Sequence, residues 1–340
     1  MARMELRLRA LGWLTRRQAS VAKMTDKQVI AMQRRHVPDN FVADWIFGAL
    51  VPGTEVADLK IPGPDCDIPA RVYRPLRAGP GPRPLIVYFH GGGFVFGNLR
   101  LGDWLCSSVA ARVGAVVVSV DYRLAPVHRF PVAVEDCYAA LAWAAANAAD
   151  LGAAGVDGAA GAHGAHGPDA RLSVMGESAG GTLSAVMCLL ARDRGGPAIS
   201  HQALIYPATD MTAVRSPAKD MPFLSHDEMT AYRRLYLGPD GNPANPWASP
   251  LLAASHDGLP PALIQVAEHD PLREDGVRYA AALRDAGVPV RFTEYVGVPH
   301  GFVNFPGLCR SAAQALAEIC AEQSAALTAT ERQVPKEPAA

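Results

Sequence analysis

The feature that most constrains this chain is a serine set among small residues directly after a short apolar run. The run covers 172–175, and Ser178 follows within Gly-Glu-Ser-Ala-Gly at 176–180. Such a pattern forces a sharp turn from a buried strand into a helix, because only small flanking residues let the two backbones pass closely enough. The turn would lift the Ser178 hydroxyl out at the carboxyl end of a sheet. The helix predicted over 182–191 would point its amino end toward that hydroxyl.

A cluster of three glycines follows a second predicted strand. Residues 84–89 are apolar throughout, which is typical of a strand buried on both faces, and they run into His-Gly-Gly-Gly-Phe at 90–94. Consecutive glycines leave backbone N–H groups uncovered, so that these groups can converge on the negatively charged oxygen of a tetrahedral intermediate. The residue after the nucleophile supplies a further donor. The sequence therefore predicts an oxyanion hole built from Gly91, Gly92, Gly93 and Ala179. Which two of the three glycines donate stays open, and a glycine turn without a chemical role is the alternative.

A histidine and an aspartate lie where a catalytic base and its partner are needed. Asp270 follows the strand predicted over 261–267, and His300 follows the strand predicted over 290–296. Catalytic groups gather just past the carboxyl ends of strands in an open α/β sheet, and the chain order Ser, Asp, His fits such a fold. Asp275 is the competing acid, but it would begin the next helix, where an acid complements the helix dipole. The predicted triad is Ser178, His300 and Asp270.

These parts predict acyl transfer through a covalent intermediate. His300 would take the proton from Ser178 and return it to the leaving alcohol, while Asp270 fixes the imidazole tautomer. Ser178 would carry the acyl group until water removes it. The predicted function is a serine carboxylesterase acting on a small-molecule ester, and this chemistry needs no cofactor and no metal. His163 and His166 have no acid or cysteine partner at ligand spacing, so no metal site is expected there.

Three further motifs carry a resemblance to a known family. They are Asp-Tyr-Arg-Leu-Ala-Pro at 121–126 followed by Phe-Pro at 130–131, Asn-Pro-Trp-Ala-Ser-Pro at 245–250, and Asp-Pro-Leu-Arg at 270–273. With the serine turn and the glycine loop, they resemble the hormone-sensitive-lipase-like bacterial esterases, family IV of the α/β-hydrolases. The resemblance implies the same triad and oxyanion hole and small soluble ester substrates with short to medium acyl chains. It also implies pairing through the last strand and helix, so we expect a homodimer.

The chain departs from that family pattern at three places. Glu177 stands where the family usually has Asp or Thr, and Val127 stands where it usually has Glu. The connection over 153–168 is longer and richer in glycine than usual. A longer acid at 177 is still expected to reach a supporting hydrogen bond, and none of the departures removes a catalytic group.

The expected organisation is one catalytic domain with a helical cap. The fold class is α/β, an α/β-hydrolase fold with a mostly parallel central sheet and helices on both faces. Two antiparallel leading strands are predicted over 54–60 and 69–74, and parallel strands over 85–89, 115–120, 171–175, 202–206, 262–267 and 290–296. The strand–helix rhythm breaks over 207–247, which would form the cap together with 1–51. The catalytic domain would take 52–206 and 248–328, and 329–340 would be a frayed tail.

Bulky apolar side chains of the cap, with two beside the glycine loop, are expected to line the substrate pocket. They would bind an acyl chain by area, at about 0.8 kcal/mol per buried methylene. These residues are Phe41, Trp45, Phe94, Phe96, Met221, Phe223 and Leu224. The alternative is that several of them only pack the cap onto the core.

Composition bounds the remaining possibilities. Lys and Arg (32) nearly balance Asp and Glu (33), so nothing points to a nucleic-acid partner. Six scattered cysteines without a C-x-x-C pair fit free thiols in a reducing compartment, and we expect a cytoplasmic protein. No apolar stretch has the length of a membrane span. The arginine-rich first 23 residues lack the apolar core of a secretory signal and are expected in the cap. A helix lying on a membrane surface and a disordered leader are the alternatives.

Two other functions use the same residues. A hydrolase scaffold can become a small-molecule receptor by losing the catalytic histidine, but His300 lies in an intact Pro-His-Gly-Phe. The triad could also cleave an amide, a lactone or an acetylated drug, and only tests of the leaving group separate these from an ester.

Overall fold

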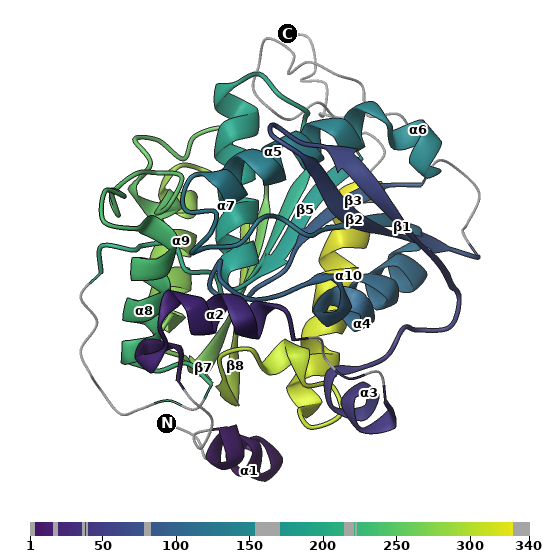
Figure 1. The fold of residues 1–340 in the computed structure, drawn as a ribbon. Helices are drawn as coiled ribbons and strands as arrows, with labels where there is room; N and C mark the ends of the chain where they lie inside the picture. Colours follow the sequence, from purple (N-terminus) through teal and green to yellow (C-terminus); the bar gives the residue numbers. More distant parts are fainter. Residues whose placement is uncertain are drawn as a thin grey trace, which may run out of the picture.

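The computed structural model describes residues 4–15, 20–35, 38, 40–77, 83–153, 171–213, 221 and 223–328 (Figure 1). The tail predicted over 329–340 lies outside the described residues. So does the glycine-rich segment from residue 154 on, with His163 and His166. Of the arginine-rich amino terminus, residues 1–3 and 16–19 also lie outside them.

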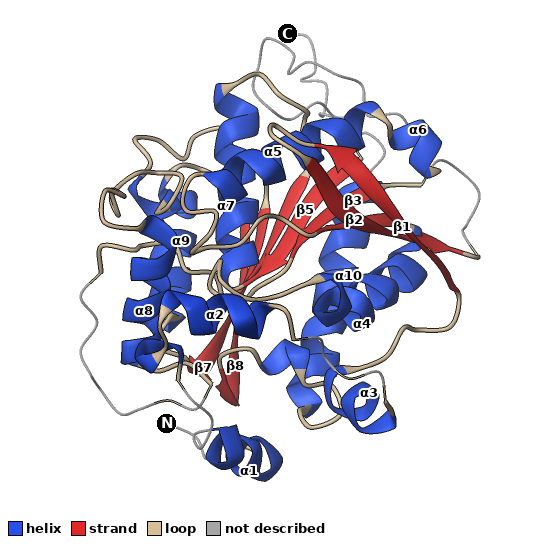
Figure 2. Cartoon of the chain, viewed as in Figure 1, coloured by secondary structure: helices blue, strands red, loops and turns tan. Residues whose placement is uncertain are grey.

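In the described part of the chain, eight strands form one sheet in the order β1-β2-β4-β3-β5-β6-β7-β8 (Figure 2). β2 pairs antiparallel with both β1 and β4, and the strands from β4 to β8 run parallel. Their bounds are β1 (Thr54–Pro62), β2 (Asp67–Pro75), β3 (Leu85–Phe89), β4 (Val116–Val120), β5 (Leu172–Glu177), β6 (His201–Ile205), β7 (Ala262–His269) and β8 (Val290–Pro299). The predicted fold class is confirmed, and every predicted strand is present with ends shifted by up to three residues.

Side chains that alternate along the strands contribute to two separate hydrophobic cores, one on each face of the sheet. In β3, Leu85, Val87 and Phe89 belong to one core, whereas Ile86 and Tyr88 belong to the other. This is the period of two of a strand that is buried on both faces. The continuous apolar runs in the sequence follow from this double burial.

Helices cover both faces of the sheet (Figure 2). Residues of α5, α7 and α9 belong to the first core, and residues of α4 and α10 belong to the second. The α-helices are α1 (Leu6–Thr15), α2 (Asp26–Gln33), α3 (Phe41–Phe47), α4 (Leu99–Val109), α5 (Val132–Ala146), α6 (Ala148–Leu151), α7 (Ala179–Asp193), α8 (His226–Leu237), α9 (Arg273–Asp285) and α10 (Arg310–Thr328). Shorter helical turns are η1 (Val21–Lys23), η2 (Ala110–Gly114), η3 (Pro250–Leu252) and η4 (Phe302–Asn304).

Parts of the two segments expected to form the cap lie against each other. Ser20 donates a hydrogen bond to Glu228 of α8 at 3.3 Å, and Asp26 of α2 lies 3.6 Å from Arg234. Ser225 and Glu228 begin α8 with a capping box, in which each side chain binds the backbone N–H of the other residue. The two segments are therefore joined by polar contacts although about 200 residues separate them in the chain.

The last residue of α2 ties this helix to the loop after β3. The Gln33 side chain donates to the carbonyl of Val95 at 2.7 Å and to that of Ala125 at 2.6 Å. Since Val95 lies in the loop just beyond the three glycines, the amino-terminal segment takes part in holding that loop.

The sequence predicted no membrane-spanning segment and free cysteine thiols. No helix within the described ranges has both the length and the apolar character needed to cross a membrane. The six cysteines are free thiols, of which Cys66 is exposed and the others are buried.

Candidate active site

Ser178 lies at the sharp turn between β5 and α7, in a backbone conformation that side chains rarely adopt. Its φ is 55° and its ψ is −118°, and its N–H donates to the Ile205 carbonyl at 2.9 Å. Glycines make the turn feasible, because a Cβ on Gly176 would overlap the Gly180 carbonyl and a Cβ on Gly180 would overlap the Phe89 carbonyl. α7 begins directly after the serine, three residues earlier than predicted.

Gly180→Ala is expected to destabilise the fold by about 3 kcal/mol, because the added methyl would collide with backbone atoms that cannot move aside. Thermal and denaturant unfolding measure the loss. Gly181→Ala is the matched control in the same helix, since its methyl would lie 3.1 Å from Cβ of Pro207 and should cost much less. Equal losses in the two variants would show that close packing at Gly180 does not govern the stability of the turn.

Ser178, His300 and Asp270 form one hydrogen-bonded row. Nε2 of His300 lies 2.9 Å from Oγ of Ser178, and Nδ1 lies 2.7 Å from Oδ2 of Asp270. The second carboxylate oxygen of Asp270 accepts the N–H of Leu272 at 2.8 Å, which fixes the orientation of the carboxylate. The three side chains are buried and come from the carboxyl ends of β5, β7 and β8. The structure thus brings together the three residues that the sequence predicted as a triad.

The competing acid, Asp275, holds a neighbouring loop. Its Oδ2 accepts the backbone N–H groups of Thr209 and Asp210 at 3.0 and 3.1 Å. Arg278 binds the Asp210 carboxylate at 2.8 Å and steadies the same loop. Because Asp210 lines the cavity described below, Asp275 shapes a wall of the site, while Asp270 contacts the histidine.

Opposing influences act on the pKa of His300. Burial lowers this pKa, but the charge of Asp270 and its hydrogen bond raise it, and the charge of Glu177 raises it further. The net result is a pKa above the ordinary value of histidine. The imidazolium form is therefore stabilised in this site, as a base that accepts a proton from Ser178 requires.

Glu177, at the end of β5, holds the glycine loop through a hydrogen bond. The N–H of Gly91 donates to Oε1 of Glu177 at 2.6 Å, which confirms that the longer acid reaches a supporting hydrogen bond. The glutamate is buried, and a Cβ on Gly91 would overlap its carboxylate. Among the described residues, the N–H groups of Gly92 and Gly93 have no acceptor. These two N–H groups are free to bind an anion, whereas that of Gly91 is occupied.

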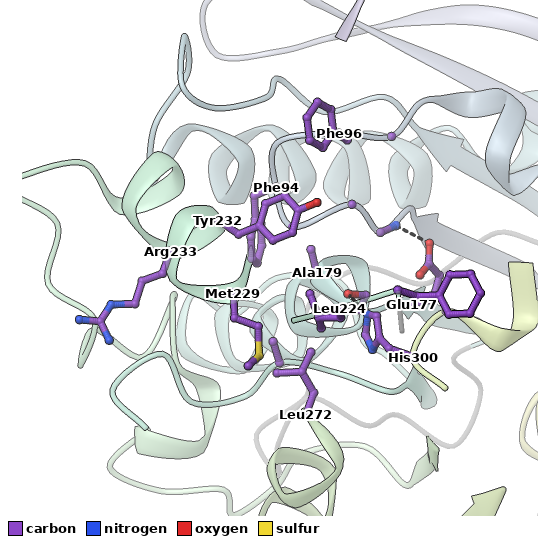
Figure 3. A pocket seen from close by; sticks show the side chains of 18 of the residues that line it. Phe94, Phe96, Glu177, Ala179, Leu224, Met229, Tyr232, Arg233, Leu272 and His300 are labelled. Atoms are coloured by element: carbon purple, nitrogen blue, oxygen red, sulfur yellow. Dashed lines mark hydrogen bonds between the residues drawn. The ribbon is translucent and has the colours of Figure 1, made fainter. Parts of the chain in front are cut away.

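A cavity of about 270 Å³ lies next to Ser178 and His300 (Figure 3). Its wall is mainly apolar, with side chains from the glycine loop, from α8 and from the segments around them. The apolar residues of the wall include Phe94, Phe96, Leu101, Met211, Phe223, Leu224, Met229 and Leu272. A volume near the lower end of the range for ligand pockets fits a small ligand.

Four of the seven residues expected in the pocket line this cavity, namely Phe94, Phe96, Phe223 and Leu224. Phe41, Trp45 and Met221 are not among the described residues that line it. The side chains of Phe41 and Trp45 are 82% and 49% exposed, because α3 buries Ala43 and directs these two aromatic groups to solvent. The structure therefore does not bring Phe41, Trp45 or Met221 to this cavity. For Phe41 and Trp45 the reason is that the face a short apolar helix buries depends on where the helix docks.

Sequence reasoning missed several cavity residues of α8. Met229, Tyr232 and Arg233 all line the cavity, and Arg233 donates to the Met211 carbonyl at 2.9 Å. The amphipathic pattern that ends at Leu237 predicted a helix here but did not show which of its side chains line the cavity. Figure 3 shows Tyr232 on the side of the cavity next to Phe94.

The sequence of this chain matches a known protein family. A model of the α/β-hydrolase fold family matches residues 86–304. The chain belongs to the α/β-hydrolase family. The hydrolase is 46% identical over 259 residues to carboxylic ester hydrolase LipN of Mycobacterium tuberculosis, a match that covers 74% of this chain and 65% of LipN. It is 41% identical to esterase LipI of the same organism, covering 78% of this chain and 80% of LipI.

Solved structures of esterases are similar over nearly the whole hydrolase. A hyperthermophilic esterase from Pyrobaculum calidifontis has a TM-score of 0.83 at 35% identity, and the match covers 95% of this chain and 99% of that one. A thermostable carboxylesterase from a metagenomic library, EstE1, has a TM-score of 0.77 at 36% identity, covering 92% of this chain and 99% of that one. The resemblance to hormone-sensitive-lipase-like esterases that the sequence motifs carry is confirmed.

Proposed function

We propose that this hydrolase is a serine carboxylesterase that cleaves esters with short to medium acyl chains. The observation that carries the proposal is the row from Ser178 through His300 to Asp270, with contacts of 2.9 and 2.7 Å, beside a small apolar cavity. The receptor function has less support, because the histidine that such proteins lose is present and within hydrogen-bond reach of the serine. The relatives that are named as ester hydrolases add to this support.

The reaction proceeds through an acyl-enzyme. Oγ of Ser178 bonds to the ester carbonyl carbon while its proton moves to Nε2 of His300. The bond to the alcohol oxygen then breaks, and that oxygen takes the proton from His300. Water next gives a proton to His300 and attacks the acyl carbon, after which the serine oxygen leaves with that proton. Asp270 keeps Nδ1 protonated, so that Nε2 faces the serine as the acceptor.

The oxyanion hole consists of the N–H groups of Gly92, Gly93 and Ala179. Gly91 is left out because its N–H already donates to Glu177 at 2.6 Å. Ala179 is the first residue of α7, where backbone N–H groups lack partners within the helix. Preorganised donors of this kind are worth about 10²- to 10³-fold in kcat each, since they bind the charge that develops in the transition state.

The segments 1–51 and 207–247 act as a cap that closes the acyl pocket. In the second segment, the wall residues Leu224 and Met229 are apolar, as an acyl chain requires. A volume of about 270 Å³ limits how many methylenes can be buried. Binding should therefore strengthen with chain length only until the cavity is filled.

A series of p-nitrophenyl esters tests the proposal. With the full chain, kcat/KM is expected to be highest for acetate or butyrate, lower for octanoate and lost for palmitate, because the longest chain exceeds the cavity. Butyryl p-nitroanilide is the control for amide cleavage and is expected to react far more slowly. Rates that rise through palmitate would contradict the size limit. No hydrolysis of any ester would contradict the esterase proposal and favour a receptor.

A further inference from the structure

The loop that carries the oxyanion donors contains a strained residue that is not glycine. Gly92 and Gly93 have φ values of 116° and 64°, and Phe94 continues this run with a φ of 62°. A bulky side chain is unfavourable in this left-handed region. Such a conformation persists only where the surrounding structure holds it, and it is concentrated at functional sites. The neighbours of Phe94 should therefore include a group that holds it.

Phe94 has two such neighbours: its carbonyl accepts the N–H of Ala125 at 3.0 Å, and its ring contacts Tyr236 of α8. The Tyr236 ring stacks face to face on the ring of Phe94, with centroids 3.9 Å apart and planes 8° from parallel. The Tyr236 ring also contacts the Phe130 ring edge-on, with centroids 5.7 Å apart. The backbone carbonyl of Tyr236 accepts the N–H of Phe130 at 2.9 Å. The hydroxyl of Tyr236 is buried and has no hydrogen-bond partner among the described residues. The flat ring, and not the hydroxyl, makes the contact.

A second tyrosine, one helical turn earlier, contacts the same loop. A Cβ on Gly93 would lie 2.5 Å from the ring of Tyr232, so the two residues are in close contact. The Tyr232 ring also meets Phe96 edge-on, with centroids 6.2 Å apart. Residues four apart lie on one face of a helix, so α8 presents both tyrosines to the loop. Figure 3 shows Tyr232 of this pair beside Phe94. The loop is thus held by Glu177 on the sheet side and by α8 on the cap side.

We propose that Tyr236 is a positioning residue for the oxyanion hole. By stacking on Phe94, it keeps the strained backbone of that residue in place, and this fixes the direction of the N–H groups of Gly92 and Gly93 just before it. The proposal rests on the proposed esterase function. If Tyr236 has this role, α8 must be docked on the loop for the oxyanion hole to stabilise the transition state. This role of α8 adds to its contribution to the cavity wall. Tyr236 itself is not among the described residues that line the cavity, so it acts through Phe94.

The test compares Tyr236→Leu with Tyr236→Phe in the full chain. Leucine removes the flat ring, so kcat for p-nitrophenyl butyrate should fall about 10- to 100-fold, part of the loss expected from removing an oxyanion donor, while KM changes little. Phenylalanine keeps the ring and should retain kcat. A trifluoromethyl ketone, whose adduct with Ser178 carries an oxyanion, should bind Tyr236→Leu more weakly by a similar factor. A leucine variant with unchanged kcat, or one that changes only KM, would overturn the proposal.

A double-mutant cycle with Phe94→Gly separates positioning from a general structural role. Glycine adopts a positive φ without strain. In a protein that already carries Phe94→Gly, adding Tyr236→Leu should therefore change kcat by no more than about threefold. An equal loss of kcat with and without Phe94→Gly would show that Tyr236 does not act through Phe94. If Tyr236→Leu fails to fold, Phe94→Leu removes the same stacking contact from the other side. A fall in kcat together with weaker binding of the ketone then supports the proposal, and an unchanged kcat overturns it. A wild-type protein that cleaves no ester would refute the proposed function instead, and the ketone adduct would still report the geometry of the hole.

Discussion

Replacing Ser178 by alanine is expected to lower kcat for p-nitrophenyl butyrate by about 10³- to 10⁶-fold. Oγ of Ser178 lies 2.9 Å from Nε2 of His300, and its removal takes away the atom that would bond to the ester. The oxyanion donors and the cavity stay in place, so a small residual rate over that of water is expected. Alanine also fits the turn without new contacts, so the melting temperature should stay close to that of the wild type.

A second serine in the same helix provides the matched control. Ser184 of α7 is buried like Ser178, and its hydroxyl donates to the Gly180 carbonyl at 2.9 Å. Ser184→Ala should leave kcat within about threefold, because removing one hydrogen bond of about 1 kcal/mol affects stability and not the chemistry. Activity that survives in Ser178→Ala, with the fold intact by circular dichroism, would refute Ser178 as the nucleophile.

Asp270→Asn is expected to lower kcat by about 10⁴-fold and to move the acid limb of kcat/KM to lower pH. The amide leaves the shape of the site in place, but it no longer fixes the tautomer with Nε2 free to accept a proton. Asp270 raises the pKa of His300 against the lowering effect of burial. Without its charge the pKa falls, so the neutral imidazole that acts as base persists to lower pH. In the wild type, activity is lost as pH falls through the raised pKa of His300.

The pH–rate profile of each variant measures this shift, and Asp275→Asn is the comparison. Asp275 holds the backbone of Thr209 and Asp210, so its substitution should lower the melting temperature and leave the position of the acid limb unchanged. An acid limb that moves in Asp275→Asn but not in Asp270→Asn would reverse the assignment of the two acids.

The sheet and the candidate triad could be predicted from the sequence because both depend on short-range patterns. A strand that is buried on both faces needs a continuous apolar run, and the runs that end before Ser178 and Asp270 are of this kind. Parallel strands then bring their carboxyl ends to one edge of the sheet, so residues far apart in the chain meet there. The small residues around Ser178 indicated the turn directly, since a side chain at Gly180 would overlap the backbone of Phe89.

The cap could not be predicted to the same depth, because its side chains are placed by docking and not by their own periodicity. Phe41 and Trp45 looked suitable for a pocket as apolar aromatic residues, yet α3 turns them to solvent. No pattern in the sequence indicated a role for Tyr236. Its role depends on the backbone conformation of Phe94, and a positive φ at a phenylalanine cannot be inferred from residue type. The helix was predictable, but its contacts with the loop were not.

The hydrogen bond between Glu177 and Gly91 restricts how this site can change over evolutionary time. A Cβ at residue 91 would overlap the Glu177 carboxylate, so a side chain there would push the carboxylate aside. The glutamate can therefore keep its present position only beside a glycine at 91. Either a larger residue at 91 or a shorter residue at 177 would lose the 2.6 Å hydrogen bond that supports the glycine loop. Residues 91 and 177 are therefore expected to change together.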